Sequence, residues 1–184
     1  HRDLHLSLRR QRQMCIRDRY YAFVYAFGDL NCHQKFERSW TINGNQMPVC
    51  ARDVGIFFGL ALGGWWFSRR GVNRWTIRDS FLSLFSDSLI EPLYMNDRRL
   101  TAMFGIGLLF CLPVILDGGI QAVTSYESNN LLRVTTGIPF GFIIGWYFSA
   151  SISSRPDRFG HDASKVHLPA GARLSTPVEA FESE

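Results

Sequence analysis

The sequence lacks the short motifs that mark several common classes of enzyme. It contains no P-loop, no GxSxG nucleophile elbow, no HExxH zinc motif and no GxGxxG dinucleotide fingerprint. These absences remove the usual signals for nucleotide-phosphate binding, serine hydrolysis, metalloprotease chemistry and dinucleotide binding. No internal repeat is visible either, which gives no indication of a solenoid or an array. The function must therefore be sought in the pattern of apolar and polar segments.

An excess of positive charge is also missing once one segment is set aside. Residues 9–19, RRQRQMCIRDR, resemble the translation of a transposase adapter used in short-read DNA libraries, so residues 1–19 are interpreted as artefactual and the native N-terminus as lost. They hold six Arg and two Asp of the chain's 20 basic and 16 acidic residues, which leaves 14 of each sign. The remaining chain is neutral, and no nucleic-acid partner is predicted.

Three long blocks of the chain contain no charged residue at all. A helix needs about 20 residues to cross a hydrocarbon core of roughly 30 Å, and each block can extend into interfacial residues. The helices of a soluble bundle would show polar outer faces, which these blocks lack. The pattern predicts an all-α, polytopic integral membrane bundle with three complete spans. The blocks are Val54–Phe67, Leu100–Leu116 and Val134–Ala150.

Shorter features complete the predicted organisation. Tyr20–Phe27 is interpreted as the end of a truncated N-terminal span, and Phe81–Leu93 as an interfacial amphipathic helix. Trp65, Trp66, Trp146 and Tyr147 fit an interfacial aromatic belt, while Gly137, Gly141 and Gly145 share one helix face suited to close packing. The domain prediction is an artefactual segment 1–19, a membrane domain 20–152 and a disordered cytoplasmic tail 153–184.

The distribution of basic residues predicts which loops are cytoplasmic. The loop Arg69–Arg99 and the C-terminal tail carry most of the Arg residues. Both are therefore predicted to lie on the cytoplasmic side of a prokaryotic cell membrane. Asn31–Asp53 and Asp117–Arg133 then lie together on the opposite face. Most of the unusual polar residues occur in these two segments, which makes them the candidate site: Cys32, His33, Gln34, Glu37, Arg38, Cys50, Arg52, Asp117, Gln121, Glu127, Asn129, Asn130 and Arg133.

The sequence motifs in these segments resemble those of a known family. The patterns CHQxxERS, VCARxxG, LDGxxQ and ESNNxLRxxTG occur in this order, separated by apolar stretches. They are similar to the predicted membrane proteins classed as domain of unknown function 2085, over about residues 20–150. The resemblance implies a multi-span helical protein with no established activity. The family often has Cys or Thr near positions 53 and 54, where this chain has Asp53 and Val54, which weakens any interpretation that needs a third nearby Cys.

The two outer cysteines allow three kinds of chemistry. Cys32 and Cys50 could form a structural disulfide, which would stabilise by roughly 3 kcal/mol on chain-entropy grounds, or remain buried free thiols. With His33, and with a carboxylate such as Asp53 or Asp117, they offer ligands for zinc or copper. Thiol–disulfide chemistry is the third interpretation and would need a thiolate of low pKa, favoured by a nearby Arg. The sequence does not select among these.

The charged residues of this face also have two interpretations. Asp117 ends an apolar block and would share a helix face with Gln121, either as a functional carboxylate at membrane depth or as a helix-end residue bonded to local backbone. Ser128 or Asn129 is expected to cap the next helix, with Glu127 paired to Arg133. The Arg residues either hold the spans in register through ion pairs or line a site for a carboxylate or phosphate.

Three functional hypotheses follow from these residues. The first is a membrane-embedded enzyme or a metal or redox protein centred on Cys32, His33 and Cys50. The second is a small-solute transporter or binding protein whose path is lined by Arg52, Asp117, Gln121 and Arg133. The third is a structural assembly module in which every charge is paired. The lipid bilayer is the predicted partner, a small-molecule substrate is compatible with the first two hypotheses, and the sequence determines neither an enzyme activity nor an oligomeric state.

Overall fold

The predicted all-α class is confirmed. The computed structural model describes residues 19–28, 30, 32, 36–42 and 44–174 of the 184-residue chain. Within these residues the regular elements are helices, apart from one antiparallel hairpin formed by β1 (Thr41–Ile42) and β2 (Asn45–Gln46). Residues 19–28 are also helical, which agrees in position with the predicted N-terminal apolar segment.

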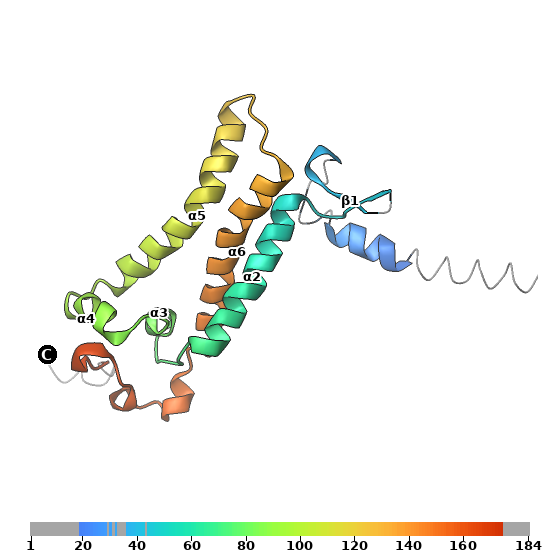
Figure 1. Cartoon of the computed structure of the whole chain (residues 1–184). Helices are drawn as coiled ribbons and strands as arrows, with labels where there is room; N and C mark the ends of the chain where they lie inside the picture. The colour runs from blue at the N-terminus through green and yellow to red at the C-terminus, as the bar shows by residue number, and fades with distance from the viewer. Residues whose placement is uncertain (1–18, 29, 31, 33–35, 43, 175–184) are drawn as a thin grey trace, which may run out of the picture.

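Three long helices form the body of the molecule: α2 (Ala51–Arg70), α5 (Arg99–Val123) and α6 (Asn130–Ser153). Figure 1 shows α2 and α6 side by side, and α5 running back towards the hairpin end before a loop leads into α6. By length and composition, α5 and α6 are the two helices of the described chain that could cross a membrane. The predicted count of three complete spans is not confirmed, because the charges at both ends of α2 leave it less apolar than α5 and α6.

The contact between α2 and α6 is made by glycines on both helices. A Cβ atom built on Gly59 or Gly63 would lie within 3.0 Å of α6 backbone atoms, and one built on Gly141 or Gly145 would lie equally close to α2. Gly55 faces Val134 near the helix starts, so the two helices run parallel. Small residues at four-residue spacing let helix backbones approach closely, as membrane helices commonly do. The predicted glycine face of α6 is therefore an observed packing surface.

Helix α5 has the burial pattern of a lipid-facing helix. Large apolar side chains project from it into open space, including Phe104, which is 65% exposed, and Leu109, which is 64% exposed. The one buried residue of α5 is the charged Asp117. A soluble domain rarely exposes so much contiguous apolar surface, whereas a bilayer covers it. The apolar side chains of α5 thus face outward and its one buried residue is charged, as expected for a helix that contacts lipid.

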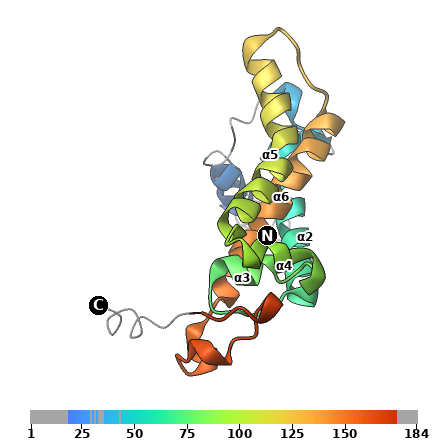
Figure 2. The same ribbon diagram turned by 90° about the vertical axis from the view of Figure 1, so that its left-hand side faces the viewer.

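The far end of the bundle holds the apolar core. The predicted interfacial helix is instead two helices, α3 (Ile77–Leu82) and α4 (Asp87–Met95), which lie beside the lower ends of the long helices in both views (Figures 1 and 2). Phe81 is 1% exposed and stacks on Trp146 with ring centroids 4.2 Å apart. The Trp146 indole also donates to the Phe81 carbonyl at 3.2 Å. Trp146 is therefore a core residue rather than part of an interfacial belt, because α3 covers it.

The beginning of the predicted tail is ordered up to Leu174. It contains three short 3-10 helices: η2 (Pro156–Phe159), η3 (Ala163–Lys165) and η4 (Pro169–Gly171). Val166 is 4% exposed and Leu168 is 8% exposed, and both belong to the same apolar cluster as Phe81. Val166 and Leu168 join the apolar cluster and η4 lies against α4, while the domain boundary at residue 153 stays a prediction. Residues 175–184 lie outside the described part.

Candidate functional site

The centre of the candidate site is an ion pair between two helices. Arg52, in the first turn of α2, donates to the Asp117 carboxylate near the end of α5. Because α2 starts where α5 ends, two residues 65 positions apart in the sequence meet at one end of the bundle. The Asp117 side chain is only 4% exposed, so this pair is largely removed from water. A buried carboxylate needs such a partner.

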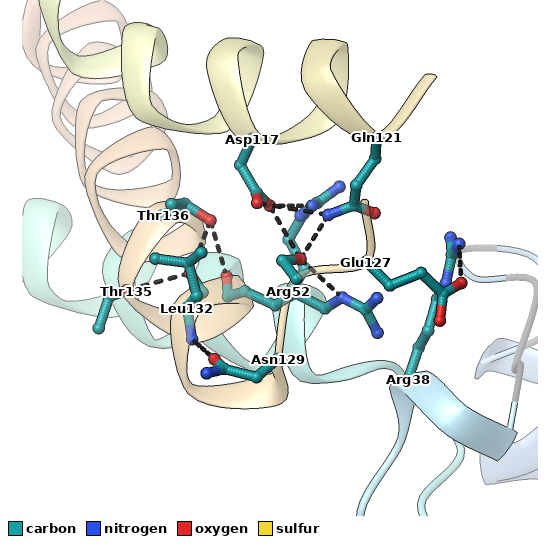
Figure 3. Close-up of polar contacts among 11 residues, drawn as sticks. Arg38, Arg52, Asp117, Gln121, Glu127, Asn129, Leu132, Thr135 and Thr136 are labelled. Carbon is teal, nitrogen blue, oxygen red and sulfur yellow. Dashed lines mark hydrogen bonds and ion pairs between the residues drawn. The ribbon is translucent and has the colours of Figure 1, made fainter. Parts of the chain in front are cut away.

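Asp117 also belongs to a hydrogen-bond network. Gln121, one helical turn further along α5, donates from Nε2 to Asp117 Oδ1 at 3.3 Å and also to the Ser128 hydroxyl. Ser128 donates to Asp117 Oδ2 at 3.3 Å, and Arg133 Nε donates to the Ser128 oxygen at 3.1 Å. Figure 3 shows the Asp117 and Gln121 side chains extending from the same face of α5 towards this network. The predicted common face of these two residues is therefore observed.

Arg133 has an unusual environment. It is 3% exposed, in the first turns of α6, and its side chain donates to Ser128. The predicted pair with Glu127 is not formed; Glu127 pairs with Arg38 at 3.5 Å instead (Figure 3). Within the described part of the chain, no carboxylate lies at ion-pair distance from Arg133. Arg38 and Arg52 repel its charge, and Glu127 attracts it without forming an ion pair. The sequence could not show that Glu127 pairs with Arg38, because Glu127 and Arg133 are close enough in the chain to form a local pair.

Further polar atoms in this region are buried without partners. Among the described side chains, Arg38 Nε, Arg52 Nε and Asn130 Oδ1 are buried and make no hydrogen bond. Asn129 has a local role as the N-cap of α6, because its Oδ1 accepts from the Leu132 amide at 2.7 Å. Asn129 therefore stabilises the start of α6, which agrees with the prediction that Ser128 or Asn129 caps this helix. The two buried arginine Nε–H groups therefore have no acceptor in the described part of the protein and could donate to a bound solute.

The thiols gather beside this network. The ligand atoms of Cys32, Cys50 and Asp53 all lie within 4.8 Å of one another, and Cys50 Sγ donates to Asp53 Oδ2 at 3.3 Å. Cys32 and Cys50 are free thiols, so the structural disulfide, one of the alternatives that the sequence left open, is not formed. Burial raises the pKa of the Cys50 thiol to about 11, and the Asp53 carboxylate acts in the same direction. A thiol that is protonated at neutral pH gives no support to the redox interpretation.

One further predicted site residue, Glu37, lies outside this cluster. Glu37, in η1 (Phe36–Arg38), is exposed to solvent. His33 and Gln34 lie outside the described residues. Ser128 is a central member that the candidate set did not include; its only sequence signal was its position before a helix start, which indicates a cap rather than a bridge between helices.

A second buried polar cluster lies at the opposite end of the bundle. Asp79 is fully buried and accepts from Tyr94 at 2.8 Å and from Arg99 at 3.3 Å. Arg74 donates to the Tyr94 oxygen at 3.3 Å, and Thr76 caps α3 by accepting from the Asp79 amide at 3.2 Å. Arg74 also pairs with Asp87 at 3.4 Å. Each arginine of this cluster thus has a carboxylate partner, and the cluster ties α3, α4 and α5 together.

A helical bundle with an apolar outer surface and buried charges at its ends defines a helical membrane protein. Residues 32–147 match the family described as "Predicted membrane protein (DUF2085)". The chain belongs to this family.

Its relatives include two archaeal proteins, both described as uncharacterized. One, from Methanothermobacter thermautotrophicus, is 32% identical over 110 residues, covering 60% of this chain and 77% of the relative. The other, from Methanocaldococcus jannaschii, is 30% identical over 126 residues, covering 67% of this chain and 65% of the relative. No solved structure shows significant similarity to the chain.

Proposed function

We propose that the chain is an integral membrane protein that binds a small inorganic or organic anion at the outer end of its bundle. The observation that carries this proposal is Arg133, a buried cation with a hydroxyl partner and no carboxylate. A guanidinium removed from water without a carboxylate at ion-pair distance is destabilising. A bound carboxylate or phosphate would supply both the missing charge and acceptors for the free guanidinium nitrogens.

The pairing of the local charges supports an anion rather than a cation. Of the three arginines at this end, Arg38 pairs with Glu127 and Arg52 with Asp117, while the third carboxylate, Asp53, accepts from Cys50 and forms no ion pair in the described structure. The parallel arrangement also places the N-termini of α2 and α6 together, and each N-terminus adds partial positive charge. Arg133 is thus left without a carboxylate at ion-pair distance in the described part of the chain, and the two helix dipoles add to its positive charge.

We also propose that α2 is a third complete span. Its glycine face follows α6 from Gly55, opposite Val134, to Gly63, opposite Phe142. A helix in backbone contact with a spanning helix over this length must lie at the same depth in the bilayer. The moderate hydropathy of α2 is compatible with that depth because its charges lie at its two ends, where they reach the interface.

The sidedness follows from the same arrangement. The end formed by α3, α4 and the folded tail carries Arg74, Arg78 and Arg99, while the anion site lies at the other end (Figures 1 and 2). Since loops rich in Arg are retained in the cytoplasm, we assign the α3–α4 end to the inside of a prokaryotic cell membrane. The anion site then faces the outside, and the protein takes up or senses a solute from there.

Ligand-dependent stability of the purified full chain tests this proposal. Inorganic phosphate, sulfate, acetate and succinate would each be added at constant ionic strength in detergent, with chloride as the reference anion. A ligand present at 100 times its Kd should stabilise the folded protein by about 2.7 kcal/mol, seen as a higher unfolding temperature. We expect this shift for at least one of the four anions.

Two variants locate the binding site. Arg133→Lys keeps the charge but loses the planar fork, and Arg133→Gln loses the charge, so the shift should be reduced in the first and absent in the second. Arg158→Gln, on the exposed η2, is the matched control and should keep the full shift. If no anion stabilises the protein, or if Arg133→Gln responds as the natural chain does, the polar residues serve only to hold the helices together and the proposal is wrong.

A further inference from the structure

Two thiols and a carboxylate converge at the start of α2. Cys32, Cys50 and Asp53 each present one ligand atom, and all three atoms lie within 4.8 Å of one another. All three residues are partly buried. The separation between Cys50 Sγ and Asp53 Oδ2 is 3.3 Å. None of its members forms an ion pair with an arginine in the described structure, although the group adjoins the arginine site closely enough for the charge of Arg133 to act on Cys50.

The local fold explains how the three residues meet. Cys50 is the N-cap of α2, and Asp53 lies three residues later, so both project from the same side of the helix start. Cys32 is fixed by its backbone amide, which donates to the Gly28 carbonyl at 2.8 Å at the end of helical residues 19–28. The chain between Cys32 and Cys50 contains the β1–β2 hairpin, which turns the chain back and closes the loop.

We propose that Cys32, Cys50 and Asp53 bind a divalent metal ion of the zinc class. The donor set suits this ion, which takes thiolate sulfur and carboxylate oxygen in tetrahedral geometry. With a Zn–S distance of about 2.3 Å, tetrahedral sulfur ligands stand roughly 3.8 Å apart. The three ligand atoms already lie within about 1 Å of that spacing. Closing around an ion therefore needs side-chain rotation and no movement of α2.

The charge balance of the loaded site is also favourable. Binding converts two thiols to thiolates and releases two protons to solvent, so the ion and its three ligands together carry one negative charge. Arg133, whose charge interacts with Cys50, and Arg52, the neighbour of Asp53 in the first turn of α2, lie close by. Three protein ligands leave the fourth position to water, as in zinc sites that act on substrates.

Cobalt(II) titration of the reduced full chain in detergent tests the site directly. Cobalt bound by thiolates gives a sulfur-to-metal charge-transfer absorption, and zinc should displace it at one equivalent per chain. Cys32→Ala and Cys50→Ala should abolish the band, and Asp53→Asn should weaken binding by about tenfold or more. Cys111→Ala, which removes a thiol on α5, is the matched control and should titrate as the natural chain does.

Thiol labelling keeps the test decisive if a variant fails to fold. In the natural chain, zinc should protect Cys32 and Cys50 from alkylation but leave Cys111 unaffected, as read by mass spectrometry. The proposal is overturned if the reduced chain binds no cobalt, if Cys32→Ala binds as well as the natural chain, or if the two thiols label only after reduction, which would show a disulfide. Loss of the anion response in Arg133→Gln has no bearing on this result, so the two sites are tested separately.

Discussion

The glycine contact between α2 and α6 makes a sharp prediction about stability. In Gly59→Ala, the new methyl group would meet the Ile138 carbonyl oxygen and would lie 2.8 Å from the Phe142 amide nitrogen. Ordinary contact begins at 3.4 Å, so α2 must move away by at least 0.6 Å, the difference between these two distances. Both atoms are backbone, so no side-chain rotation can relieve the clash.

The expected free-energy change follows from two opposing effects. Overpacking of a close contact costs about 1–3 kcal/mol, and a backbone obstacle places this site at the upper end of that range. Replacing Gly by Ala within a helix returns up to about 1 kcal/mol. Gly59→Ala should therefore lower the free energy of unfolding by about 2 kcal/mol.

Gly105→Ala on α5 is the matched control. Its new methyl group would have no atom within 4 Å, so this variant should be unchanged or more stable by up to about 1 kcal/mol. Unfolding in mixed micelles with increasing dodecyl sulfate, followed by the fluorescence of the five tryptophans, would measure both. If the two variants unfold at the same detergent fraction, α2 and α6 do not pack in this register and the argument for α2 as a span fails.

Three further variants test individual contacts. Asp117→Asn leaves Arg52 unpaired in a largely buried place and should lower stability by about 3 kcal/mol, with the Arg52→Met, Asp117→Leu double variant recovering much of the loss in the same detergent assay. Asn129→Ala removes the cap of α6 and should cost about 1 kcal/mol; an unchanged midpoint would show that the cap is solvated. Tyr94→Phe deprives buried Asp79 of a donor and should cost about 1–3 kcal/mol, measured by thermal unfolding, with no effect on anion binding at the other end.

The buried pairs at the two ends have different consequences. Around Asp79, donors and acceptors are balanced, and burial raises the pKa of Tyr94 well above its usual range, so its hydroxyl remains a donor. Around Arg133 they are not balanced, and among the described side chains two neighbouring buried donors, Arg38 Nε and Arg52 Nε, remain unused. A matched cluster stabilises a fold by itself, whereas an unmatched one depends on a solute to complete it. This contrast is why we place the function at the α2 start and not at the α3–α4 end.

Local sequence patterns were sufficient to predict some features of the structure. The absence of charge in Leu100–Leu116 predicted α5, the four-residue spacing of Gly137, Gly141 and Gly145 predicted a packing face, and Asn129 was one of two expected caps. Other features depended on contacts between distant segments. Trp146 looked interfacial because the sequence does not show that α3 covers it, and Glu127 looked like the partner of Arg133 because the competing Arg38 is far away in the chain.

The sequence by itself determined the class of the protein, because hydrocarbon surroundings impose long uncharged helices whatever their mutual arrangement. It also determined which residue types were available for a site. Tertiary structure alone decided their partners: Arg52 with Asp117, and Cys32 with Cys50 and Asp53. Ion pairing and metal coordination depend on distances of a few ångströms between side chains. Those distances are set by the register of α2 against α6 and by the direction of α5, which no local pattern specifies.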